Sequence, residues 1–574
     1  MAEKIISPGV FQNESDQSLV QRGIQGTSTA IVGPTVLGRP YVPTYVTSYS
    51  EYLAKFGSTF KSGSYYYEYL TSLAAKEYFQ NGGQTLLVTR IISGTANAQT
   101  YAQANVTQVS SSAATSFQLE ALAWGDIMNN TSSLSGGALA SGSAYNVRYE
   151  ITNVNTGSGT FNLAIRAGND SEAQKNYLET WPNLSLDPNL PNFISRVIGD
   201  TKPVYALDSS STPFISISGS YANASQYVRI SSITTPQVDS IDNNGNFKAA
   251  IYSGSLPALG SGSFGGSFAG GTAATTTVQK MNEDITITNL EGFAPADYNT
   301  ALALLTNKDE YQFNVLIAPA VGLDCTAAAT VISVVEARGD AFAPLSAGIY
   351  GTSITAATTI AAGQSSNYAA TYYPWIQLYN SNLGKNVWSP ATTVMGGVLA
   401  FNDQVSAEWF APAGLNRGGV PSVLRAEKKL SQADRDTLYS ANVNPLATFP
   451  GEGVVVFGQK TLQRKATSLD RVNVRRLLIA LKGFIGQVGR NLVFEQNTIA
   501  TRNRFLAQVN PYMESVVQKQ GLYAYKVVMD DTNNTPDVID RNQLVGQIYI
   551  QPAKTAEFII LNFNVLPTGA IFPA

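Results

Sequence analysis

The sequence predicts a multidomain protein of mixed α+β and α/β architecture, in which an α/β middle domain is interrupted by a β-rich insertion. The chain has 574 residues, several times the roughly 150 of an average domain. Strand and helix patterns alternate over residues 28–92 and again after residue 285, which is typical of an α/β layer. Between these segments the composition shifts to Ser, Thr, Gly, Ala and Asn, with short alternating runs that indicate antiparallel strands.

The α/β pattern depends on apolar runs of different period. STAIVGPTV (28–36) predicts a buried strand, and TLLVTRII (85–92) predicts the next one. Residues 65–83 predict a helix between them, with Tyr66 and Leu70 on its apolar face. From residue 285 onward we expect, in order, a strand and turn (ITITNLEG), a helix (DYNTALALLTN), a strand (FNVLIAPA) and a helix (AATVISVVEARGD).

The insertion contains strand patterns, one short helix and a Gly/Ser-rich stretch. YNVRYEI (145–151) and FNLAIRA (161–167) predict strands, PNFISRVIG (191–199) predicts a helix, and residues 253–272 indicate a flexible linker. The linker includes a G-x-G-x-x-G motif at Gly260, Gly262 and Gly265. A dinucleotide site would need a strand before this motif and a helix after it, and GSFAGGTAATTT forms no helix. We therefore predict no cofactor here.

These patterns divide the chain into six segments. They are an N-terminal arm (1–22), a first α/β part (23–92), one or more inserted β-rich outer domains (93–278), a second α/β part (279–400), a C-terminal α/β core domain (401–555) and a C-terminal arm strand (556–574).

Composition excludes several classes of function. The chain has no histidine, which removes Ser-His-Asp and Cys-His catalysis and His-ligated zinc. The single cysteine, Cys325, allows no intrachain disulfide and fits a reducing compartment. A net charge of −3 provides no field that would attract nucleic acid or anionic lipid. No apolar run reaches the roughly 18 residues of a membrane span, and the first residues lack a signal-peptide pattern.

Charged residues make up 13% of the chain, about half of the roughly 25% typical of soluble domains. A surface of this kind repels its own copies weakly and suits side-by-side packing, although a β-rich protein with many polar turns would have the same composition. DSIDNNGN (239–246) and DDTNNTPDVID (530–540) are oxygen-rich, but both lack the closing Glu of a Ca²⁺ loop, and turns explain them better. We predict that the protein is not an enzyme and has no catalytic residue, cofactor or metal.

Residues 471–492, RVNVRRLLIALKGFIGQVGRNL, predict an amphipathic helix with no acidic residue. Two interpretations stay open: a solvated helix face, or a docking surface for an acidic partner. Nucleic acid is a poor candidate, since no aromatic residues lie between the charges. The basic residues of this helix are Arg471, Arg475, Arg476, Lys482 and Arg490.

Both ends of the chain predict extended arms. In AEFIILNFNV, apolar and mixed positions alternate as in a strand. Left unpaired, a long apolar terminal strand would aggregate, whereas docking on a neighbouring subunit would connect two copies. The residues that we expect to pair between subunits are Ile6, Val10, Phe11, Phe558, Ile559, Ile560, Leu561, Phe563 and Val565.

Several stretches resemble proteins of the contractile-tail sheath family. They include ISPGVFQNE (6–14), NGGQTLLVTRI (81–91), YYPWIQL (372–378), WFAPAGLNRGGV (409–420) and the long segment at 493–531. WPNLSLDPNLPNFISRVIGD (181–200) also resembles a family segment, whereas residues 101–180 and 201–278 match poorly.

The resemblance implies a structural subunit of a myovirus-type phage tail sheath. Such subunits form hexameric rings stacked helically around an inner tail tube, with baseplate and tail terminator proteins as further partners. The sheath is held extended and shortens to drive the tube through the host envelope. The middle domain would be subtilisin-like without catalytic residues, inserted β domains would project outward, and the arms would add strands to neighbouring subunits. Together with this resemblance, the five cations predict that the basic face of the 471–492 helix points to the inner tube. The protein would lie in the virion, after assembly in the bacterial host cytoplasm.

Other functions stay open at this point. The sheath of a cell-encoded contractile injection system would have a very similar sequence. An enzyme on the α/β scaffold would need a cluster of carboxylates or lysines that the spacing does not supply. Another self-assembling surface or capsid protein is a further alternative.

Overall fold

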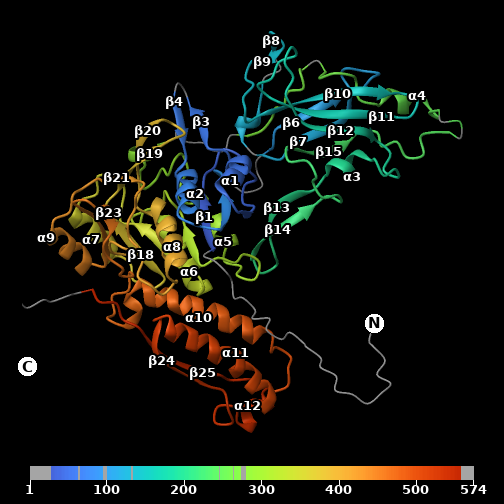
Figure 1. The fold of residues 1–574 in the computed structure, drawn as a ribbon. Helices are drawn as coiled ribbons and strands as arrows, with labels where there is room; N and C mark the ends of the chain where they lie inside the picture. Colours follow the sequence, from blue (N-terminus) through green and yellow to red (C-terminus); the bar gives the residue numbers. More distant parts are fainter. Residues whose placement is uncertain are drawn as a thin grey trace, which may run out of the picture.

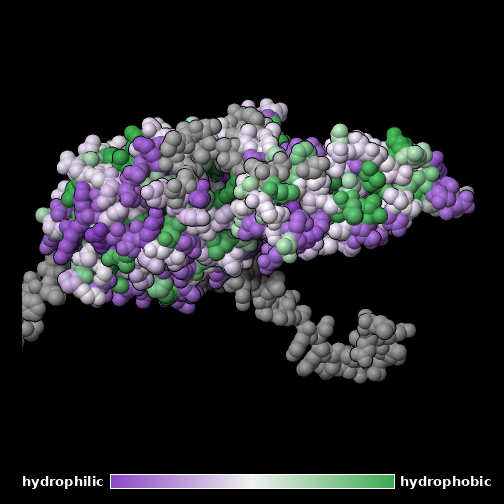
Figure 2. Space-filling model, turned by 90° about the horizontal axis from the view of Figure 1, so that it is seen from above, coloured by the Kyte–Doolittle hydropathy of each residue, from purple (hydrophilic) through white to green (hydrophobic). Residues whose placement is uncertain are grey.

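The computed structural model describes residues 28–557, apart from 63–64, 95–99, 124, 131–133, 243, 245, 263 and 273–279. It is a mixed α/β structure in three parts, with the inserted region projecting to one side of a central domain and a helical layer below it (Figure 1). On the face seen in Figure 2, polar and apolar residues are intermixed, with apolar patches over the inserted region at the right.

The central domain is built on two four-stranded sheets, ordered β2-β5-β1-β16 and β17-β18-β22-β23. A parallel bridge from Val315 to Phe342 joins them edge to edge. The inner strands run parallel, and β2 and β23 are antiparallel edge strands. The strands are β2 (Thr44–Val46), β5 (Thr85–Arg90), β1 (Ser28–Gly33), β16 (Val315–Ile317), β17 (Ala343–Ser346), β18 (Ala369–Tyr373), β22 (Val443–Phe449) and β23 (Gly453–Val456).

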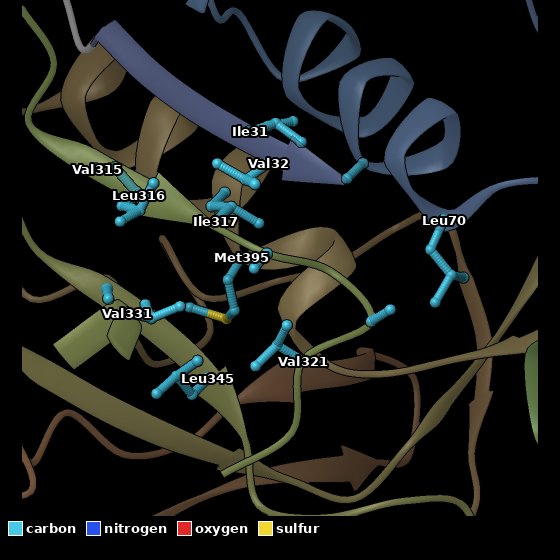
Figure 3. Close-up of a cluster of buried hydrophobic side chains, with 14 of the residues drawn as sticks. Ile31, Val32, Leu70, Val315, Leu316, Ile317, Val321, Val331, Leu345 and Met395 are labelled. Carbon is cyan, nitrogen blue, oxygen red and sulfur yellow. The ribbon is translucent and has the colours of Figure 1, made fainter. Parts of the chain in front are cut away.

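Helices cover this sheet and bury its apolar strands. Helix α2 packs against α8, and α5 packs against α6. Ile31, Leu316 and Met395 lie in the resulting core, each fully buried (Figure 3). The helices are α1 (Tyr49–Phe56), α2 (Leu70–Gln80), α5 (Asp297–Leu304), α6 (Thr326–Arg338), α7 (Ile354–Ala362), α8 (Thr392–Val405) and α9 (Gln432–Ser440). Small peripheral sheets are β3 (Thr59–Ser62) with β4 (Tyr65–Glu68), and β20 (Lys385–Ser389), β19 (Ile376–Asn380) and β21 (Val423–Ala426).

The inserted region has a hydrophobic core of its own, formed by buried residues between Ala102 and Phe268. Phe117 and Phe161 stack in it with ring centroids 5.7 Å apart. Its sheets are β15-β7-β6, β10-β11-β12, β13-β14 and β8-β9. The elements are β6 (Gln103–Thr107), β7 (Thr115–Ala121), β8 (Leu134–Ser135), β9 (Ala138–Leu139), β10 (Val147–Asn155), β11 (Thr160–Ala167), β12 (Tyr177–Ser185), α3 (Ile194–Ile198), β13 (Lys202–Leu207), β14 (Pro213–Ser218), β15 (Val228–Ile233) and α4 (Ala250–Gly254).

The C-terminal layer is a helical hairpin covered by a two-stranded ribbon. Its core residues, among them Leu481, Val509 and Met513, are buried separately from the central core. The elements are α10 (Val472–Arg490), α11 (Ile499–Gln518), β24 (Leu522–Val528), α12 (Pro536–Asp540) and β25 (Gln547–Pro552).

The predicted flexible linker at 253–272 is ordered wherever the structure describes it. Its backbone forms three isolated β-bridges with the inserted region, among them Gly260 with Ile151 and Ala269 with Gln103. Leu256 and Phe268 are fully buried. The prediction was wrong because a glycine-rich composition also permits close packing: a Cβ on Gly266 would lie 2.1 Å from the Tyr149 carbonyl oxygen.

Two further expectations differ from the structure. The helix predicted at 65–83 starts only at Leu70, because Tyr65–Glu68 pairs with β3 as a hairpin; Tyr66 is accordingly 58% exposed. The expected boundary at residue 401 is also wrong. Strand β22 pairs with β18, so this part of the chain completes the central domain, and the C-terminal layer begins with α10.

The segment ITITNLEG, predicted as a strand followed by a turn, forms tight turns throughout, and Glu291 is buried inside them. Glu291 has a φ of 60°, and its Oε1 accepts the Leu70 N–H at 2.8 Å, which caps α2. Its Oε2 is buried and has no hydrogen-bond partner among the described residues. Burial raises the pKa of Glu291 to about 8, against the smaller effect of the Leu70 hydrogen bond. Glu291 is therefore largely protonated at neutral pH.

The C-terminal layer is joined to the central domain by two buried arginines of α10. Arg476 is 3% exposed and donates to both carboxylate oxygens of Asp403 on α8, at 2.7 and 2.5 Å. Arg475 is 3% exposed, lies 4.0 Å from the Tyr368 ring centroid and donates to Asn367 Oδ1 at 2.7 Å. Removing one member of such a buried pair leaves an uncompensated charge.

We expect Glu291→Gln to stabilise the central domain increasingly as pH rises. The folded-state pKa of about 8 exceeds the ordinary 4.5. The stability contributed by the protonated group is thus complete below about pH 4.5 and is lost as pH rises through about 8. The difference of about 3.5 units corresponds to roughly 5 kcal/mol at most. Urea unfolding followed by circular dichroism at mildly acidic and alkaline pH measures it; an identical pH dependence in both proteins would contradict this prediction.

Asp403→Ala should destabilise the protein by about 3–5 kcal/mol, because it leaves Arg476 buried and unpaired. The matched control is Asp309→Ala, which removes an exposed pair with Arg490 at 3.2 Å and should change stability by less than about 1 kcal/mol. Combining Asp403→Leu with Arg476→Met should restore much of the loss. Denaturant unfolding compares the three variants. Equal effects of the two alanine variants would mean that the buried Arg476–Asp403 pair contributes no more to stability than an exposed ion pair.

Candidate assembly site

The C-terminal layer gathers the features through which this chain can contact other molecules. Helices α10 and α11 lie side by side below the central domain (Figure 1). Phe484 and Tyr512 stack between them, with ring centroids 3.8 Å apart. Three parts of the layer are accessible from outside the subunit: the outer surface of α10, the turn between α10 and α11, and the β24–β25 ribbon.

The five basic residues of α10 do not form one exposed face. Arg475 and Arg476 are buried, as described above, and Arg471 precedes the helix as its N-cap and bonds within the chain. The expectation of a shared basic face is therefore wrong for these three. The acidic and aromatic partners come from distant segments, so the absence of acids within 471–492 gave no sign of them.

Arg471 belongs to a polar cluster around Glu557, the last residue that the structure describes; we call Arg471, Tyr439, Gln459 and Glu557 the Glu557 anchor. Arg471 donates to both Glu557 oxygens at 2.7 and 3.1 Å. The Tyr439 hydroxyl and Gln459 Nε2 donate to them at 2.8 and 3.1 Å. Burial alone would raise the pKa of Glu557, but these hydrogen bonds outweigh it and lower the pKa. The anchor thus holds the chain where it leaves the C-terminal layer, and it weakens only in acid.

The outer half of α10 keeps two exposed cations and three glycines. Lys482 is exposed, and Arg490 pairs at the surface with Asp309. A Cβ on Gly483, Gly486 or Gly489 would meet no atom of another described residue within 4 Å, so packing among these residues does not require glycine. Each exposed helical glycine lowers stability by about 1 kcal/mol relative to alanine. The resulting surface, which we call the α10 glycine face (Lys482, Gly483, Gly486, Gly489 and Arg490), combines three residues without side chains with two basic residues.

The β24–β25 ribbon is the second element open to partners. It pairs antiparallel from Leu522 with Pro552 to Val528 with Gln547, and one side contacts α11. In the described part of the chain neither strand has a second neighbour. Both outer edges therefore carry backbone donors and acceptors free to pair with another strand.

The expected pairing residues of the two arms lie outside the described residues. This concerns Ile6, Val10, Phe11, Phe558, Ile559, Ile560, Leu561, Phe563 and Val565.

No catalytic or metal-binding constellation emerges among the described residues. They contain no group of three or more Cys, Asp or Glu side chains placed to hold a metal ion. The Asp530 carboxylate accepts a hydrogen bond from the Thr532 N–H, and Asn533 Oδ1 accepts one from the Asp530 N–H, as in an ordinary turn. Residues 239–246 are described only in part. Burial raises the pKa of the Cys325 thiol, which disfavours the reactive thiolate. Nowhere in the described ranges is a helix both long and apolar enough to span a membrane.

Comparison with known proteins identifies the two domains. Residues 291–462 match the phage tail sheath protein central domain, and residues 464–566 match the phage tail sheath C-terminal domain. The first match ends where the central sheet is complete. Together the two matches include the Arg476–Asp403 ion pair, the α10 glycine face and the β24–β25 ribbon.

Curated relatives with the name tail sheath protein come from phages. The chain is 41% identical to that of Vibrio phage KVP40 over 194 residues, which is 34% of this chain and 29% of the relative. It is 40% identical to that of Enterobacteria phage T4 over 208 residues, 36% of this chain and 32% of the relative. The chain therefore matches about a third of the length of these relatives.

The fold as a whole resembles the crystal structure of a sheath tail protein from Listeria innocua. The TM-score is 0.54 at 11% identity, with 92% of both chains covered; at this identity the likeness concerns the fold alone. The resemblance inferred from the sequence motifs is confirmed by the two domain matches and the phage relatives. By these matches, residues 291–566 of the chain belong to the phage tail sheath family.

Proposed function

We propose that this chain is the structural subunit of a contractile phage tail sheath, which forms stacked hexameric rings around the tail tube and shortens to drive the tube through the host envelope. The observation that carries the proposal is the uninterrupted order of the two sheath domains across residues 291–566. The tube, baseplate and tail terminator proteins would be its partners, and the virion tail its location after assembly in the host cytoplasm. The subtilisin-like character of the central domain is part of this proposal.

Self-assembly would proceed through the terminal arms. The Glu557 anchor fixes the point at which the C-terminal arm leaves the subunit, so the arm starts from a defined direction. Within the described residues, the ribbon on the same layer has two unpaired edges. A strand from a neighbouring copy would gain backbone hydrogen bonds there without specific side-chain chemistry. Such a connection would persist when subunits rotate, because the docked strand moves with the neighbouring subunit while the Glu557 anchor moves with its own.

The α10 glycine face would contact the inner tube. Glycines let another backbone approach a helix closely, and Lys482 and Arg490 add attraction to an acidic surface. An exposed charge pair contributes only about 0.2–1 kcal/mol. A contact of this strength holds the tube through many repeats, while each single contact breaks easily during contraction.

The sheath of a cell-encoded contractile injection system is the alternative. The relatives at 40–41% identity are phage proteins, which favours the virion. Genes for capsid proteins beside this one would support the phage assignment. Electron microscopy of the purified chain tests the structural role itself: tubes of stacked rings support it, whereas monodisperse monomers or flat sheets would contradict it.

A chain truncated after Glu557 should fold but fail to polymerise, because it keeps the anchor and loses the arm. Removal of residues 1–14 should have the same effect. Sedimentation beside the full-length chain measures polymer formation, with circular dichroism as the folding control. A variant that lacks only residues 571–574 is the matched control and should polymerise normally. Full-length-like tubes from either arm deletion would show that the strand pairs within its own subunit.

The triple change Gly483→Ala, Gly486→Ala and Gly489→Ala should change two properties in opposite directions. It should stabilise α10, by up to about 1 kcal/mol for each glycine, because each Cβ enters open space. It should also weaken co-assembly with the cognate tube, since the added methyl groups keep the tube surface away. Thermal unfolding measures the first effect and tube content of purified sheaths the second.

Lys482→Glu tests the charge of the same face, and Lys429→Glu, at an exposed position of the central domain, is its control. Only Lys482→Glu should reduce tube content, and more so at low salt. Unchanged tube content in both the triple glycine variant and Lys482→Glu would show that α10 does not contact the tube.

A further inference from the structure

The turn between α10 and α11 carries an unusual apolar tip. Phe494 is fully exposed, and Val493 and Ile499 beside it are 60% and 61% exposed. Phe494 also has a φ of 71°, a conformation that bulky side chains rarely adopt. We call Val493, Phe494, Glu495 and Ile499 the Phe494 knuckle. Strain that aims a large apolar side chain into solvent indicates a contact surface.

The knuckle is held rigid by the structure beneath it. The N–H groups of Val493 and Glu495 donate to the carbonyl groups of Arg490 and Leu492 at 3.3 and 3.1 Å. Asn497 Nδ2 donates to the Gln543 carbonyl oxygen at 2.8 Å, which ties the turn to the segment before β25. A preorganised tip loses little conformational entropy when it binds.

A groove that fits such a tip lies at the other end of the same helices. It has a volume of about 770 Å³ and lies between the central domain and the C-terminal layer. Its lining includes the aromatic side chains of Trp409, Phe410, Phe457 and Tyr523 and the guanidinium groups of Arg417 and Arg435.

The two arginines of the groove stack on aromatic rings and have no acidic partner. Arg417 lies 5.0 Å from the Phe410 centroid and Arg435 5.9 Å from that of Phe457. Neither forms an ion pair with a carboxylate in the described part of the chain. The knuckle carries Glu495, whose only ion pair there is a long one of 3.7 Å to Arg504. The lining also includes Lys554 and the carboxylates of Asp436 and Glu557, of which Glu557 is held by Arg471. Arg417 and Arg435 are therefore the cations of the groove that can receive Glu495, and its aromatic side chains match the apolar tip.

Their placement is head to tail. Helix α10 starts beside the groove, which Asn473 lines, and ends just before the knuckle, so its 19 residues separate the two sites by roughly 28 Å. Helix α11 runs back from Ile499 to the groove side (Figure 1). Two different surfaces at opposite ends of one rigid unit produce a heterologous contact, which closes into a ring or continues as a helix.

We propose that the Phe494 knuckle of one subunit inserts into the groove of a second copy of this chain. Phe494 occupies the aromatic lining, and Glu495 pairs with Arg417 and Arg435. The proposal rests on the self-assembly proposed above and adds a rigid contact to the flexible connection through the arms. The groove also borders residues 553–557, so the knuckle of one subunit would meet the base of another subunit's C-terminal arm.

The test compares Phe494→Asp with Ile251→Asp, a matched change of a side chain that is 65% exposed in the inserted region. Because both side chains lie in solvent, neither change should alter folding, which circular dichroism verifies. Phe494→Asp should raise the protein concentration needed for polymers by at least about tenfold, the effect of losing one buried aromatic contact. Ile251→Asp should leave this concentration unchanged.

Cross-linking identifies the occupant of the groove. A chain with Phe494→Cys and a chain with Tyr523→Cys are mixed and oxidised; covalent dimers should form in the mixture and not in either chain alone. The native Cys325 is buried and does not interfere. Normal polymers of Phe494→Asp, or no cross-link in the mixture, would overturn the inference while the sheath function stands. A wild-type chain that forms no polymer under any condition would overturn both.

Discussion

The pairing of strand β1 on both sides is the constraint on which the rest of the structure depends. β1 pairs in parallel with β5, which follows it after α1 and α2, and with β16, where Thr29 lies opposite Val315. The chain between β5 and β16 must therefore leave the sheet and return to it. Since loop-closure entropy grows only slowly with length, this excursion can contain a region with its own core. The insertion enlarges the subunit without disturbing the central sheet.

The sequence predicted the central strands well because their environment is uniform. β1, β5 and β16 are buried on both faces, so their runs of Ile, Val and Leu need no knowledge of the partner strand. Where several environments could explain one pattern, the predictions were wrong. Tyr65–Glu68 has helical neighbours but pairs as a hairpin. The glycine-rich segment 253–272 forms β-bridges to the inserted region, where Gly266 allows close backbone contact, and is not a linker. The place of β22 in the central sheet was equally hidden, since periodicity does not specify which sheet a strand joins.

The candidate site could be predicted only in outline. The sequence located the basic helix, yet three of its five cations bond to Asp403, Asn367 and Glu557, which lie at least 70 residues away in the chain. Tertiary partners of this kind leave no local pattern. The glycine spacing of α10 was visible in the sequence, but open space around it was not. Phe494 is one aromatic residue in an apolar context, and only its exposure and positive φ distinguish it from a core residue.

The distribution of strong and weak interactions suits a subunit that moves as a rigid body. Arg148, Arg166 and Arg476 are nearly or fully buried and form ion pairs inside the subunit, where separation would leave charges unpaired. The outer features are different in kind: strand edges, a glycine-lined helix face and an apolar tip. Each provides a modest contact that can be broken without unfolding the subunit. Repetition along an assembly adds these contacts together, so stability of the whole and release at each position are compatible.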